Sequence, residues 1–162
     1  MAEDDLKYLS QSRHSKTITD LKMADNLINM DRFPDFLDMV TAFKHQLQYF
    51  DISGCLSEPV HLRNFFLRLQ CMQELKYLCM TTTELPRVLL LELIDNVAKI
   101  ASFQVLKMLF PRDILETSDE TELEEDLTVI EPRKREFCSF IHNHVSQLCD
   151  KLGRSKFVVA LR

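Results

Sequence analysis

Four residues near the C-terminus are of the types that bind metal ions: Cys138, His142, His144 and Cys149. On a helix, Cys138, His142 and Cys149 would share one side. The two cysteines are eleven positions apart, so a rise of about 1.5 Å per residue separates them by roughly 16 Å, whereas zinc ligands lie about 2.0 to 2.3 Å from the metal. One helix therefore cannot bring all three to one ion, and Cys138 with His142 would need ligands from another segment. We predict no metal site and no bound cofactor.

The sequence also lacks the common catalytic motifs. Loops that bind phosphate groups need several glycines, and Gly54 and Gly153 are the only two in this chain. No nucleophile elbow, HExxH pair or CxxC pair occurs. The triplet His142-Asn143-His144 spells H-N-H, but a nuclease of that kind needs a ββα-metal setting that a helical segment does not offer. We therefore predict a protein that is not an enzyme.

Three consecutive basic residues, Arg133, Lys134 and Arg135, could contact nucleic acid or an acidic partner. Residues 113–131, immediately before them, contain nine acidic residues and no Lys or Arg, within a chain whose formal net charge is −5. No exposed aromatic residues alternate with the basic ones, as stacking on bases would require. This pattern favours a solvated helix start partly neutralised by the acidic segment, with nucleic-acid binding as an alternative.

The elements that would position these residues are expected to be helices. Glycine is nearly absent, 46% of the residues are hydrophobic, and apolar residues recur at helical spacing along most of the chain. The predicted helices span residues 17–30, 34–50, 59–80, 84–110 and 132–153, and residues 155–162 form either a sixth helix or an edge strand.

Residues 84–110 are apolar enough to form the central helix of the protein. We predict an all-α, single-domain bundle of five or six mainly antiparallel helices around it. No internal sequence repeat is apparent, but the spacing of the first helix starts leaves a short α-solenoid fragment of the HEAT or armadillo kind as an alternative. Residues 1–16 are expected to be a flexible N-terminus, residues 17–162 the helical domain, and residues 113–131 an acidic linker within it.

Several features favour an intracellular protein, cytoplasmic or nuclear. Five cysteines suit free thiols in a reducing compartment. The first residues, Met1 to Asp5, are acidic where a signal peptide would be basic and then apolar. The most apolar run, Val88 to Phe110, carries four charged residues, so no membrane association is predicted.

The end of the predicted central helix suggests a binding surface. Phe103, Leu106 and Phe110 are spaced i, i+3 and i+7, so they would continue its polar stripe as an apolar one, with Lys107 at the rim. Either a later segment of the chain covers these residues, or they line a groove for a helix or peptide of a partner protein. We predict the second role, that of an adaptor or scaffold domain, and self-association through the same surface is a further alternative.

Overall fold

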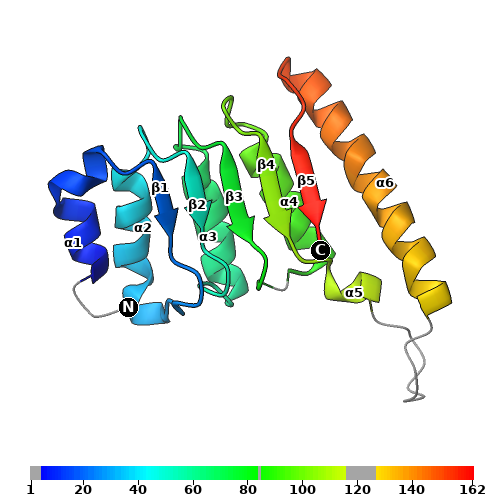
Figure 1. Ribbon diagram of the computed structural model, residues 1–162, viewed down its shortest axis with the longest axis horizontal. Coiled ribbons are helices and arrows are strands. Elements are labelled where there is room, and N and C mark those ends of the chain that lie inside the picture. The colour runs from blue at the N-terminus through cyan, green and yellow to red at the C-terminus, as the bar shows by residue number, and fades with distance from the viewer. Residues whose placement is uncertain (1–4, 84, 116–126) are drawn as a thin grey trace.

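The computed structural model describes residues 5–83, 85–115 and 127–162, in which helices and strands alternate along the chain (Figure 1). In chain order the elements are α1 (Asp5–Gln11), the 3-10 turn η1 (Arg13–Lys16), β1 (Asp20–Lys22), the 3-10 turn η2 (Met30–Arg32), α2 (Phe33–Ala42), β2 (Tyr49–Asp51), α3 (Pro59–Leu69), β3 (Tyr77–Met80), α4 (Arg87–Val97), β4 (Val105–Met108), α5 (Arg112–Leu115), α6 (Leu127–Leu152) and β5 (Val158–Leu161).

The strands form one parallel sheet in which each strand lies beside its predecessor in the sequence, in the order β1-β2-β3-β4-β5. Parallel neighbours need a crossover, and each crossover here contains a helix. Figure 1 shows α2, α3, α4 and α6 side by side on one face of the sheet. Among the described residues no helix covers the other face. The molecule is a single row of strand–helix units.

The prediction of an all-α bundle is therefore wrong, and the helical-solenoid alternative is wrong as well, because each unit contains a strand. The predicted central helix over residues 84–110 is divided into α4, a turn and β4. The predicted helices over 17–30, 34–50 and 59–80 likewise include β1, β2 and β3. Strands of three or four residues are too short for apolar residues to distinguish a period of two from one of 3.6.

The ends of the chain also differ from expectation in part. Residues 5–16, expected to be flexible, form α1 and η1, and the side chain of Leu6 is only 2% exposed. Residues 155–162 contain β5, the edge-strand alternative. Most of the predicted helix over 132–153 lies within α6. The predicted acidic linker begins in α5 and ends in α6, and its residues 116–126 lie outside the described part of the chain.

The register of the strands reveals an internal sequence repeat, which corrects the expectation that the chain has none. Equivalent positions in the first four units are occupied by Ile18, Leu21, Met23 and Asn26; by Leu47, Phe50, Ile52 and Cys55; by Leu75, Leu78, Met80 and Thr83; and by Phe103, Leu106, Met108 and Pro111. This is the spacing of a leucine-rich repeat, L-x-x-L-x-L-x-x-N/C, with a period of about 28 residues. The repeat is hard to see in the sequence because Ile, Met and Phe replace leucine at many of these positions.

The core lies between the sheet and the helices. Phe36 of α2, Phe50 of β2 and Phe65 of α3 are each 0% exposed. The ring centroid of Phe65 lies 5.5 Å from that of Phe36 and 6.2 Å from that of Phe50. Contacts of this kind add about 0.5–1.5 kcal/mol to what burial of the rings contributes.

The turns after β1 and β2 each contain one residue in the left-handed backbone conformation, and only one of these residues is glycine. Gly54 follows β2 with φ 69°, and Asp25 occupies the equivalent position after β1 with φ 60°. A Cβ atom on Gly54 would lie 2.8 Å from Oδ1 of Asp25 and 2.9 Å from Oγ1 of Thr82. Asp tolerates the left-handed conformation, so the first unit does not need glycine there.

Arg154 joins the last unit to the fourth. Its guanidinium donates hydrogen bonds to the carbonyl oxygens of Ala98 (2.9 Å), Ile100 and Phe103. The C-terminus of a helix leaves carbonyl groups without hydrogen-bond donors and carries a partial negative charge. At the end of α4, the guanidinium of Arg154 supplies both the donors and a positive charge. The same guanidinium lies 5.3 Å from the ring centroid of Phe157.

Candidate functional site

The face of the sheet opposite the helices carries two rows of side chains. Strand residues alternate between faces, and Leu21, Phe50, Leu78, Leu106 and Val159 point toward the helices. Their neighbours form the open sheet face: Asp20, Tyr49, Tyr77, Val105 and Val158 in one row, and Lys22, Asp51, Cys79, Lys107 and Ala160 in the other.

An aromatic pair lies on the open sheet face at the start of β2 and β3. The ring centroids of Tyr49 and Tyr77 are 6.3 Å apart on neighbouring strands, and Nζ of Lys22 lies 5.6 Å from the Tyr49 centroid. The Tyr77 side chain is exposed, whereas Tyr49 is partly covered. Tyrosine offers a large apolar ring and a polar hydroxyl at a small cost in side-chain entropy, which suits contact with another protein.

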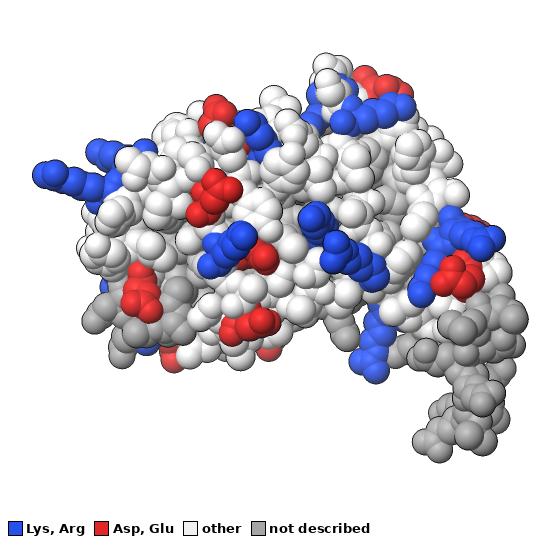
Figure 2. Space-filling model, in the orientation of Figure 1, with Lys and Arg blue, Asp and Glu red and all other residues white. Residues whose placement is uncertain are grey.

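Charges of both signs surround this pair. Asp20 and Lys22 lie on β1, Asp51 on β2 and Lys107 on β4. Figure 2 looks onto this face and shows acidic and basic side chains beside one another among uncharged ones. The pKa of the Tyr49 hydroxyl is raised above its usual value, first by partial burial and then by the nearby Asp51. The hydroxyl therefore remains a hydrogen-bond donor at neutral pH.

Hydrogen bonds fix the end of the open sheet face. Oγ of Ser53 lies 3.1 Å from Oγ1 of Thr81 and accepts a hydrogen bond from the Thr81 backbone N–H at 3.0 Å. Sγ of Cys79 lies 3.6 Å from Oγ of Ser53, and Cys79 is 8% exposed. These contacts tie the segments after β2 and β3 together, at the opposite end of the two strands from Tyr49 and Tyr77.

The predicted partner-binding residues fall in different environments. Phe103 and Leu106 are 1% and 0% exposed, so a partner cannot contact them while the protein is folded. Leu106 lies on the buried side of β4 and Phe103 in the segment before this strand, whereas the helical interpretation placed both at the surface. Phe110 is half-buried, with Nζ of Lys134 lying 5.6 Å from its ring centroid. Lys107 alone lies on the open sheet face.

The basic cluster lies at the start of α6 and does not form an isolated cationic patch. Nζ of Lys134 is 3.6 Å from Oε1 of Glu131. Arg133 lines a small pocket together with Asp113 and Glu136. Carboxylates thus lie near Arg133 and Lys134, and no observation in the described residues favours nucleic-acid binding there.

The candidate metal ligands are also separated. Cys149 is 0% exposed in the core, whereas Cys138 and His142 line a groove beside β5. His144 instead lies 2.9 Å from Asp95 of α4 through its Nε2 atom. Within residues 5–83, 85–115 and 127–162, no group of three His, Cys, Asp or Glu side chains could hold a metal ion.

Sequence reasoning missed the tyrosines of the open sheet face. Tyr49 and Tyr77 lie in two different predicted helices, over residues 34–50 and 59–80. Two separate helices gave no reason to expect the two side chains to be neighbours. The repeat spacing would have found them, because both follow the first apolar position of their unit by two residues.

Comparisons with known proteins bear on the fold. No protein-family model matches the sequence, and no curated protein matches it in sequence. A solved structure of similar fold is the tropomodulin C-terminal domain of Caenorhabditis elegans, with a TM-score of 0.58 and 12% identity over 88% of this chain and 99% of that one. This likeness shows an α/β, leucine-rich-like fold and overturns the all-α prediction. None of the described helices combines the length and apolar character needed to cross a membrane.

Proposed function

We propose that this chain is a non-catalytic interaction domain that binds a partner protein on the open sheet face. The observation that carries the proposal is the tyrosine pair on two neighbouring strands, with Tyr77 exposed and charges of both signs nearby. Interface centres are enriched in tyrosine, and complementary charges around them select the partner and its orientation.

The dimensions and charge of this face suit a protein better than a nucleic acid. Four strand spacings of about 4.8 Å give a width of roughly 19 Å from β1 to β5, enough for a substantial part of a standard interface. Asp20 and Asp51 balance Lys22 and Lys107 on this face. A phosphate backbone binds where cations are concentrated, so this balanced set gives it little advantage.

Site-specific photo-crosslinking in cells tests the proposal. A benzophenone amino acid replaces Tyr77 on the open sheet face or, as the matched control, Leu67 on α3, which is 60% exposed on the helical side. We expect one protein to be crosslinked from position 77 and not from position 67. A partner recovered only from position 67 would contradict the proposal.

Alanine variants then measure the contribution of the aromatic pair. With the crosslinked partner purified, changing Tyr49 and Tyr77 together to alanine should weaken binding by about tenfold to a hundredfold, since buried tyrosines are common hot spots. Leu67→Ala should leave the affinity unchanged. Equal affinity of the tyrosine variant and the unaltered chain, with unchanged circular dichroism, would place the interface elsewhere.

A further inference from the structure

The two ends of the sheet are finished differently. At the β1 end no described residue pairs with the outer edge, but β1 carries the charged residues Asp20 and Lys22, which oppose the addition of a strand. At the other end, β5 pairs with β4, and no described residue pairs with its outer edge. An unpaired strand edge is a template for another strand.

The backbone groups that face this edge can be identified from the pairing. The N–H of Val158 donates to the carbonyl oxygen of Gln104 at 2.8 Å, and the N–H of Arg162 donates to that of Met108 at 3.1 Å. Successive strand residues direct these groups to opposite sides. Val159 and Leu161 therefore present their N–H and C=O groups outward. The strand residues Val158–Leu161 include no proline and no charged residue, which are the usual means of blocking an edge.

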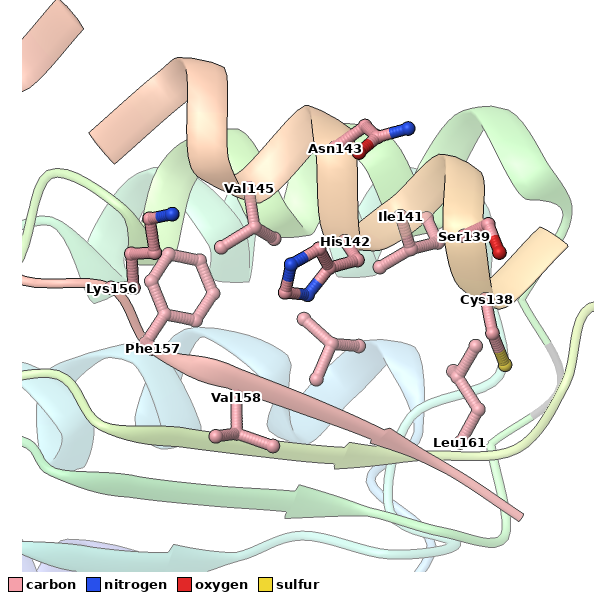
Figure 3. A pocket seen from close by; sticks show the side chains of 11 residues that line it. Cys138, Ser139, Ile141, His142, Asn143, Val145, Lys156, Phe157, Val158 and Leu161 are labelled. Carbon is pink, nitrogen blue, oxygen red and sulfur yellow. The ribbon is translucent and has the colours of Figure 1, made fainter. Parts of the chain in front are cut away.

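A groove of about 610 Å³ lies beside this edge, between β5 and α6. Figure 3 shows Ile141, His142 and Val145 on the helix, with Phe157 and Val158 of the β5 segment across from them. The side chains of Ile141, Val145 and Phe157 are 3%, 5% and 5% exposed and form an apolar floor. A guest strand would thus find both backbone partners and an apolar support for alternate side chains.

Charge at the ends of the groove indicates the occupant. Lys156 lines the groove before β5, Arg162 follows the strand, and both are exposed. No acidic residue is among the residues that line the groove. A second copy of the chain, paired antiparallel through β5, would bring Lys156 of one copy near Arg162 of the other, and like charges facing each other across strands are destabilising. An acidic-flanked segment would instead meet opposite charges.

We propose that the outer edge of β5 and the groove beside α6 bind an extended apolar segment of another protein, flanked by acidic residues, which adds a sixth strand to the sheet. Apart from residues of β5, this surface and the open sheet face have no residues in common, so it can be tested independently of the proposed function.

The probe is a capped synthetic peptide of about ten residues, the upper range of a strand, with alternating valine and threonine between glutamates at both ends. The chain contains no tryptophan, so a single tryptophan in the peptide reports binding by its fluorescence. We expect binding at the 162-residue chain to weaken about tenfold when lysines replace the glutamates, because several exposed charge pairs change sign. The double variant Lys156→Glu/Arg162→Glu should reverse this preference.

Backbone pairing is tested with two N-methylated peptides of identical composition. One carries methyl groups on the N–H groups that would face β5, and the other carries them on the alternate residues. Only the first should lose binding, by about tenfold or more, since hydrogen bonds in strand addition supply the affinity. Val159→Pro should have a similar effect, because proline removes an N–H from the outer edge and leaves the bonds to β4 in place.

Several results would overturn the proposal. Equal binding of the two N-methylated peptides would exclude strand addition, and equal binding of the glutamate and lysine peptides would exclude the acidic occupant. Absence of binding by every peptide at millimolar concentration would exclude the site. Dimers detected by light scattering and abolished by Val159→Pro would identify a second copy as the occupant. Tyr77→Asp should leave peptide binding unchanged, which separates this site from the open sheet face.

Discussion

Replacing Gly54 by alanine tests the packing of neighbouring repeats. An alanine held at φ near 69° costs about 1–2 kcal/mol from the left-handed conformation alone. Its Cβ atom would also approach Oδ1 of Asp25 to 2.8 Å and Oγ1 of Thr82 to 2.9 Å. Both atoms end exposed side chains, so moving them aside costs about 0.5–1.5 kcal/mol in side-chain conformation. We therefore expect Gly54→Ala to lower the free energy of unfolding by about 1.5–3.5 kcal/mol.

Gly153 provides the matched control for this change. It has nearly the same backbone conformation, with φ 63°, but a Cβ atom there meets no atom within 4 Å. Gly153→Ala should therefore cost only the conformational part, about 1–2 kcal/mol. Urea denaturation followed by circular dichroism measures both variants, and the difference between them reports the contact between repeats.

A rescue experiment makes the reasoning more specific. Thr82→Ala removes one of the two approached atoms, so combined with Gly54→Ala it should recover about 0.5–1 kcal/mol relative to the sum of the single changes. Equal destabilisation by Gly54→Ala and Gly153→Ala, with no coupling to Thr82, would refute the claim that the turns of adjacent units pack against each other.

Other predictions concern the last unit, the cysteines and the open sheet face. Arg154→Lys should lower the free energy of unfolding by about 1–3 kcal/mol in urea denaturation, because an ammonium group cannot reach the same set of carbonyl oxygens as the planar guanidinium. Among the five thiols, Cys71 and Cys138 are exposed and should react rapidly with a thiol reagent in the folded protein, while the buried three react only as it opens. Tyr49→Phe should remove the last-ionising tyrosine in an ultraviolet titration, since partial burial and Asp51 raise the pKa of Tyr49. The unfolded chain loses that proton first, so Tyr49 should make stability fall as the pH rises above about 10, and the phenylalanine variant should show less of this fall.

The helices were the more predictable part of this fold. The apolar stripe and the proline at the start of α3 located its beginning at residue 59, and α6 contains most of a predicted helix. Both elements are long enough for the 3.6-residue period to recur several times. The strands span three or four residues and follow short turns without glycine, so their apolar residues extended the pattern of the preceding helix.

The candidate site was less predictable for the same reason. A helix over residues 84–110 would place Phe103, Leu106 and Phe110 on one surface. Strand β4 instead directs Leu106 into the core and Lys107 to the open sheet face. Tyr49 and Tyr77 are neighbours because β2 and β3, about 28 residues apart in the sequence, pair in register. In the sequence, only the repeat period reveals that relation. The pairing of Arg154 with the end of α4 has no comparable sequence signal. It depends on how the last strand–helix unit packs against the fourth in the folded protein.

The arrangement of the units in a single row affects where the molecule opens. In such chains each unit is stabilised mainly by its immediate neighbours, so fraying starts at the ends and amide hydrogens in the central strands exchange last. Tyr49 and Tyr77 lie on β2 and β3, which have neighbours on both sides. The aromatic pair is thus held by the most cooperative part of the fold, and little conformational freedom remains there for a binding event to remove.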